Sequence, residues 1–145
     1  MTGARGTRAI LRAVQNRIVV RYADGTVIKG TTADFSPGRP SFHVALSASG
    51  SAPEVIEILL TQLKAVFFVK DFTGNSTYNE MKTFAAGAVQ GRKIEVEFAD
   101  GEKLVGTTMG YQPDRPGFFL VPADPKSNNE RCYIVKTAVK DVRFL

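Results

Sequence analysis

The stretch RIVVRYADGTVIKGTT, residues 17–32, decides the fold, because the chain contains it twice. It returns as KIEVEFADGEKLVGTT, residues 93–108, at an offset of 76 positions (93 minus 17). The match continues through GTTADFSPGRP over GTTMGYQPDRP and closes with LKAVFFV, residues 63–69, over VKDVRFL, residues 139–145. Nineteen of the 53 aligned pairs between positions 17 and 69 are identical, without a gap. Such a match indicates that one unit has been duplicated.

Each copy has the pattern of short β-strands. Apolar and polar residues alternate along 17–22 and 93–98, which is typical of a strand with one buried face. Asp-Gly follows at positions 24–25 and 100–101, and this dipeptide between two such runs is the strongest short signal for a hairpin. Gly30, which returns as Gly106, lies within the second strand and predicts a sharp bend.

Three further apolar runs complete each copy. They are SFHVAL, EVIEIL and AVFFV in the first copy, and GFFLVP, RCYIVK and DVRFL in the second. Five short strands with a bent second strand are typical of a small barrel. We therefore expect a mainly β fold with two tandem five-stranded barrels of SH3-like, Sm-like or PilZ-like type.

The duplication also sets the domain boundaries. We expect a basic arm or short helix over 1–16, because Ile10, Leu11 and Val14 have helical spacing. The first barrel repeat is expected over 17–70 and the second over 92–145. The linker between them, 71–91, begins with turn residues and is compatible with a short helix.

The charge is uneven along the chain. The formal net charge is +5, and residues 1–70 hold nine Lys and Arg against four acids, whereas residues 71–145 hold ten against ten. An anion site is therefore best sought in the first half. No apolar run is long enough to span a membrane, and the single cysteine fits a reducing compartment, so we expect a cytoplasmic protein.

Residues for catalysis are few. His43 is the only histidine and is expected on the exposed face of a strand, while Cys132 aligns with Ile56 and is expected in the core. Neither forms a nucleophile–base pair or a metal-ligand motif with its sequence neighbours. We therefore expect no enzyme activity, no metal and no cofactor.

One group of residues has the chemistry of an anion site. Arg8 and Arg12 stand one helical turn apart before the first strand, and Asp34, Ser36 and Arg39 follow the second strand. Paired arginines can bind phosphates and stack on a base, and a carboxylate can accept hydrogen bonds from guanine. The alternative is structural: Asp34 and Ser36 make a turn, and Arg39, which returns as Arg115, braces the loop.

This RxxxR…DxS pattern resembles the PilZ domain, a bacterial small barrel that binds cyclic di-GMP. The resemblance implies that the first repeat binds the nucleotide through these residues. It departs from the family's pattern at position 39, where arginine replaces glycine.

A broader resemblance involves the runs DFSPGRPSFHV and LKAVFFVKDFTGNSTYNE. These are similar to a bacterial family of unassigned function, often found beside PilZ or signalling domains. The resemblance implies a β-rich accessory module.

The copies differ on the outer face of their last two strands. Val55, Leu59 and Phe67 form an apolar strip in the first copy, and their equivalents are Arg131, Val135 and Arg143. A monomer rarely leaves such a strip open. We expect it to be an interface, covered by the N-terminal arm, the linker, the second copy or another subunit.

Three functions agree with these observations. The first is a bacterial regulatory module that binds cyclic di-GMP through the first repeat. The second is an RNA- or DNA-binding protein of Sm-like or SH3-like character. The third is a protein-interaction or scaffolding module, with a protein partner or a homo-oligomer. All three are binding functions without catalysis.

Overall fold

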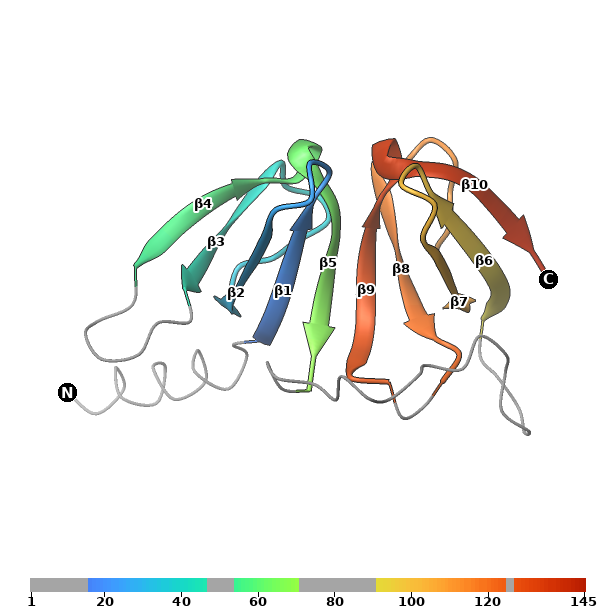
Figure 1. The fold of residues 1–145 in the computed structure, drawn as a ribbon, viewed down its shortest axis with the longest axis horizontal. Coiled ribbons are helices and arrows are strands. Elements are labelled where there is room, and N and C mark those ends of the chain that lie inside the picture. Colours follow the sequence, from blue (N-terminus) through green and yellow to red (C-terminus); the bar gives the residue numbers. More distant parts are fainter. Residues whose placement is uncertain (1–15, 47–53, 71–90, 125–126) are drawn as a thin grey trace.

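The computed structural model describes residues 16–46, 54–70, 91–124 and 127–145 (Figure 1). These residues are mainly β, as the sequence predicts. The first repeat supplies β1 (Asn16–Tyr22), β2 (Val27–Thr32), β3 (Ser41–Leu46), β4 (Val55–Leu59), the 3₁₀ turn η1 (Leu60–Gln62) and β5 (Leu63–Val69). The second supplies β6 (Arg92–Phe98), β7 (Lys103–Thr108), β8 (Gly117–Pro122), β9 (Asn129–Val135), η2 (Lys136–Ala138) and β10 (Val139–Phe144).

The expected helices within 1–16 and 71–91 lie largely outside the described residues. None of the helices that the structure describes is long and apolar enough to cross a membrane.

The described strands form one ten-stranded antiparallel sheet. Its order is β10-β6-β7-β8-β9-β5-β1-β2-β3-β4, so each repeat has the same internal order of fifth, first, second, third and fourth strand. The repeats meet where β5 pairs with β9, and Figure 1 shows these strands side by side at the centre of the molecule. The sequence predicts two tandem five-stranded barrels. The observed ladders join the two repeats into one sheet, because the fifth strand of the first repeat pairs with the fourth strand of the second. The closure of each repeat into a barrel stays a prediction.

Both Asp-Gly pairs form the tight turns that the sequence predicts. Gly25 and Gly101 have φ values of 97° and 96°, a region in which glycine is favoured. The Asp24 Oδ1 accepts a hydrogen bond from the Thr26 N–H at 2.9 Å, and Asp100 Oδ1 accepts one from the Glu102 N–H at 3.0 Å. The turns of the two repeats are therefore built alike.

The glycine in the second strand of each repeat allows a close crossing with the third strand. A Cβ placed on Gly30 would lie 2.3 Å from the Ala45 carbonyl oxygen, and one on Gly106 would lie 2.1 Å from that of Val121. Among the described residues, two pairs join β2 to β3, Gly30↔Leu46 and Thr31↔Ala45. The glycine therefore lets the backbones of the second and third strands approach closely, which a side chain at this position would prevent. The bend expected at this glycine stays a prediction.

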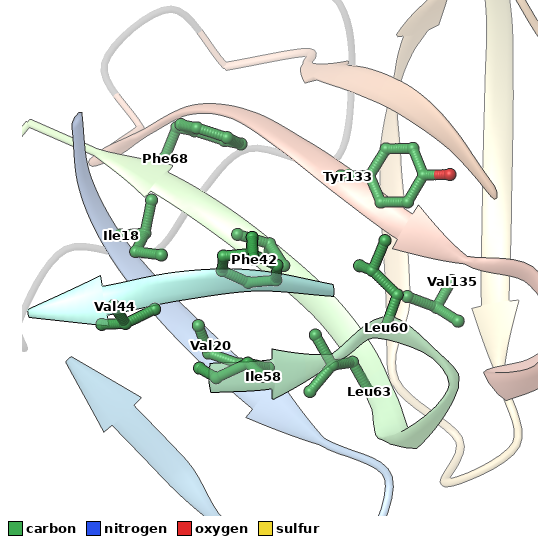
Figure 2. Packing of buried hydrophobic residues seen from close by; sticks show 11 residues of the cluster. Ile18, Val20, Phe42, Val44, Ile58, Leu60, Leu63, Phe68, Tyr133 and Val135 are labelled. Atoms are coloured by element: carbon green, nitrogen blue, oxygen red, sulfur yellow. The ribbon is translucent and has the colours of Figure 1, made fainter. Parts of the chain in front are cut away.

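Two hydrophobic clusters form the core, and each contains residues from both repeats. In the first cluster, Tyr133 and Val135 of β9 pack with residues of the first repeat, and Figure 2 shows them facing Leu60 at η1. In the second, Ala65 and Phe67 of β5 pack with residues of the second repeat. Each repeat is small for independent stability, and this exchange of side chains lets each complete the core of the other.

Candidate functional site

The loop between β2 and β3 holds three of the predicted anion-site residues. The Asp34 Oδ1 accepts hydrogen bonds from the His43 N–H at 2.9 Å and from the Thr32 hydroxyl at 3.1 Å. The Asp34 Oδ2 lies 2.8 Å from His43 Nδ1. Both carboxylate oxygens therefore bind groups of the protein itself.

The surroundings of Asp34 favour its charged form. Burial would raise the pKa of this carboxyl, but the hydrogen bonds from His43 and Thr32 outweigh it and leave the pKa below its usual value. Sequence reasoning missed the contact of Asp34 with His43. A signal was present, since the second repeat replaces both residues together, by Gly110 and Phe119.

The rest of this loop forms a turn. The Ser36 carbonyl accepts the Arg39 N–H at 3.1 Å, and Gln112 and Arg115 make the same bond at 3.1 Å in the second repeat. The Arg115 Nε also donates to Gln112 Oε1 at 3.0 Å, so this arginine braces the loop of the second repeat. The same role for Arg39 stays a prediction. Arg39 is exposed. Residues 8 and 12 lie outside the described residues, so the structure does not place the predicted arginine pair.

The predicted interface residues have two different positions. Phe67 is 5% exposed, packs in the second core cluster and has the Arg21 guanidinium 5.3 Å from its ring centre. It therefore contributes to the junction between the repeats. Val55 and Leu59 lie on β4, at one end of the sheet, and are 61% and 44% exposed. No described residue covers them.

Cys132 and His43, the residues considered for catalysis, contact residues that stabilise the fold. Cys132 is buried and belongs to the second core cluster. The His43 side chain is half exposed and contacts Asp34. Within the part of the chain that the structure describes, no three His, Cys, Asp or Glu side chains are grouped so that they could hold a metal ion.

Two neighbouring clefts open at the junction of the repeats. They have volumes of about 450 and 480 Å³, and both are lined by Arg115, Pro116 and Tyr133. The first also contains Pro37 from the first repeat, so both repeats form its wall. The second also contains Lys136 of η2. We call the two together the junction cleft.

Aromatic rings shape the floor of the junction cleft. Tyr133 has its ring centre 5.2 Å from that of Phe119 and 5.3 Å from that of Phe35. Its ring lies over Gly117, where a Cβ would come within 2.6 Å of the phenol oxygen. Burial raises the pKa of Tyr133, while the positive charge of Arg115 acts in the opposite direction. The phenol therefore remains a hydrogen-bond donor at neutral pH.

A third cleft on the junction, of about 520 Å³, is polar, and Arg21 and Glu102 are among its lining residues. Glu102 belongs to a group of ion pairs between the repeats. The Lys64 Nζ of β5 lies 2.7 Å from Asp100 Oδ2 and 2.5 Å from Glu102 Oε1, both on the turn between β6 and β7. Arg21 adds a longer contact to Glu102, at 3.6 Å. Lys64 is only 8% exposed, so these pairs hold the repeats in register.

The comparison with protein families gives a match that spans both repeats and the segment between them. A family model described as a family of unknown function, DUF6982, matches residues 14–145. The chain belongs to this family. No curated protein and no solved structure matches it.

Proposed function

We propose that this member of DUF6982 is a non-enzymatic binding module and that its ligand occupies the junction cleft. The observation that supports this is a pair of cations, Arg115 and Lys136, beside the Tyr133 ring and Pro116. Among the described residues that line the two openings, Asp114 is the only acid, which leaves two cations against one acid. This chemistry suits a ligand with a flat ring and negative charge, of which a cyclic dinucleotide is one.

The choice of the cleft over the β2–β3 loop rests on the state of Asp34. Its two oxygens already accept from His43 and Thr32, so a guanine edge would have to compete with these bonds. In the cleft, the Arg115 guanidinium keeps further N–H groups beyond its bond to Gln112, while the buried Tyr133 ring lies beneath. The role of Arg8, Arg12, Asp34, Ser36 and Arg39 in binding cyclic di-GMP stays a prediction.

Calorimetric titration with cyclic di-GMP, and with GMP as a simpler phosphate, tests both placements. The matched variants are Arg115→Gln and Arg39→Gln, which change the equivalent arginine of each repeat. If the ligand lies in the junction cleft, Arg115→Gln weakens binding about tenfold or more, since a charge-assisted contact is lost. Arg39→Gln and Asp34→Asn then leave the affinity unchanged.

The opposite pattern would move the site to the β2–β3 loop. Loss of binding in Asp34→Asn and in the double variant Arg8→Ala/Arg12→Ala, with Arg115→Gln unaffected, contradicts the cleft. If the folded parent protein releases no heat with either nucleotide, a nucleotide ligand is excluded at both places. Melting curves of all variants control for folding.

A second candidate function is protein interaction or scaffolding. It is favoured by a separate observation, the exposed apolar side chains of Val55 and Leu59 on one end strand and Phe144 on the other.

The nucleic-acid alternative stays a prediction, which titration with a generic RNA at two salt concentrations tests. We also propose, as part of the binding-module function, that each repeat is an SH3-like or Sm-like barrel and that the protein acts in bacterial cytoplasmic signalling.

A further inference from the structure

The junction between the repeats is a head-to-tail contact. The fifth strand of the first repeat, β5, pairs with the fourth strand of the second, β9, with Ala65↔Ile134, Val66↔Tyr133, Phe67↔Cys132 and Phe68↔Arg131 opposite each other. The two surfaces in this contact are different, so it is not a symmetric pairing. Because each repeat carries both kinds of surface and the contact uses one of each, one surface of each kind remains unpaired among the described strands.

Those two remaining surfaces are the ends of the sheet. By the offset of 76, β10 is the equivalent of β5, and β4 is the equivalent of β9. Both are end strands in the order of the sheet, and no described residue adds a further strand to either. In the part of the chain that the structure describes, both partners of the contact that the chain already makes once within itself are therefore present at open edges.

We propose that the occupant of the β4 edge is β10 of a second copy of this chain, in the register of the β5–β9 contact. The offset then places Val142 opposite Glu57, Arg143 opposite Ile56, and Phe144 opposite Val55. The inference rests on the second candidate function, scaffolding, and is independent of a ligand in the junction cleft.

Exposed apolar side chains support this register. Phe144 is 41% exposed on β10, Val55 is 61% exposed on β4, and the equivalence sets them opposite each other. Leu59 at the end of β4 is the equivalent of Val135, which is buried in the first core cluster at the existing junction. Continuing the sheet would thus cover the apolar side chains that both edges leave open.

An ion pair of the junction has its equivalents at the two edges. Lys64 and Asp100 correspond to Lys140 and Asp24. Asp24 holds its turn through Oδ1, as Asp100 does, and in Asp100 this leaves Oδ2 for the lysine. Lys140 is 67% exposed, and its contact with Glu97 is long, at 3.9 Å. The ammonium group can therefore reach Asp24 of the next copy.

One aromatic contact is replaced by a polar pair. Phe35 and Tyr133, with ring centres 5.3 Å apart across the existing junction, correspond to Tyr111 and Glu57. Between copies, the Tyr111 hydroxyl would donate to the Glu57 carboxylate. Both members of the contact have changed, and the new pair is chemically complementary.

The edge surfaces are more polar than the junction, which predicts a reversible assembly. β10 carries Asp141 and Arg143 where β5 has Ala65 and Phe67, and charged residues on an end strand weaken pairing. Arg143 comes with its own partner, Glu95 at 3.6 Å, so it brings little unbalanced charge into the contact. We expect assembly that depends on concentration and salt, in contrast to the permanent junction.

A cysteine cross-link tests the pairing directly. Opposite residues of antiparallel strands have Cα atoms about 4.5–5.5 Å apart, within the range that a disulfide spans. In Val55→Cys/Phe144→Cys, mild oxidation should therefore give a ladder of covalent multimers on a non-reducing gel. Neither single variant should give it. A dimer from Val55→Cys alone would overturn the proposal in favour of symmetric β4–β4 pairing.

Sedimentation velocity supplies the readout that does not depend on those variants. The average mass of the sedimenting species should rise with the concentration of the parent protein. Lys140→Glu should raise the dissociation constant of the assembly about tenfold. Lys103→Glu, the same charge change on the inner strand β7, should leave this constant unchanged. A parent protein that stays monomeric to near-millimolar concentration overturns the proposal. The ligand titrations of the junction cleft are unaffected by that result, so the two failures are distinguishable.

Discussion

At the scale of single residues, the contact between Asp34 and His43 shows how one pair of side chains can tie a loop to the sheet. The Asp34 carboxylate accepts from the backbone and approaches the ring of His43, and it also accepts from Thr32. The second repeat keeps the threonine, as Thr108, whose hydroxyl donates to the Phe119 carbonyl at 2.7 Å. The second repeat therefore holds its loop without an aspartate. Asp34 is an addition of the first repeat, and its role in stability and in binding can be tested separately.

The pH dependence of stability tests the structural role of Asp34. The folded protein lowers its pKa from the ordinary value of 3.8, so the carboxylate stabilises the fold above that pH. The contribution is lost as the pH falls through the lower folded value. Asp34→Asn should therefore cost about 1 kcal/mol at neutral pH, a modest figure because the group is partly exposed. The cost should vanish in strong acid.

Urea unfolding of the parent and of Asp34→Asn at several pH values measures this difference. The double variant with His43→Phe, the residue of the second repeat, separates the side-chain contact from the backbone bond. If the difference between parent and Asp34→Asn were the same at pH 7 and pH 2, the carboxylate would not be the stabilising group.

At the scale of elements, a special role of the glycine in the second strand was predictable and the pairing between repeats was not. Gly30 and Gly106 recur at the same place within a strand pattern, and in the structure the backbone of the third strand lies close to both. Nothing in the alternation of apolar residues distinguishes a strand that closes its own barrel from one that pairs with another repeat. The uniformly buried LKAVFFV run of β5 contained that information, because a strand with both faces buried must have a core on each side.

Substitution of the strand glycine tests the close crossing. Gly106→Ala places a Cβ within 2.1 Å of the Val121 carbonyl oxygen, and backbone atoms must move to accept it. We expect a loss of about 2 kcal/mol in the free energy of unfolding, within the range for overpacking. The control is Gly110→Ala, where no atom lies within 4 Å of the added Cβ and no such loss is expected. Equal stabilities of the two variants in urea would contradict the crossing.

At the scale of the whole molecule, the repeats depend on each other. Tyr133 and Val135 of the second repeat complete the first core cluster, and Phe67 of the first completes the second. Ion pairs from Lys64 to Asp100 and Glu102 fix the register of this exchange. The sequence predicts that Phe67 is covered from outside its own repeat, but it leaves open what covers it, since the arm, the linker and another subunit were equal alternatives. Packing across the β5–β9 contact selects the second repeat.

Because each core is completed by the other repeat, damage at the junction should spread to both. Phe67→Arg imitates Arg143 of the second repeat, but at a side chain that is 5% exposed and already close to the Arg21 guanidinium. We expect a loss of about 3 kcal/mol or more in the free energy of unfolding, since a buried cation would lack a partner. Val27→Lys imitates the second repeat in the same way at a 49% exposed position, and there we expect a change below about 0.5 kcal/mol.

Hydrogen exchange on Phe67→Arg should show β1 and β6 losing protection together, because the two clusters share their boundary strands. Loss of protection confined to β6 and its neighbours would mean that the first repeat is stable without the second, and the molecule would then be two domains joined by a strand contact.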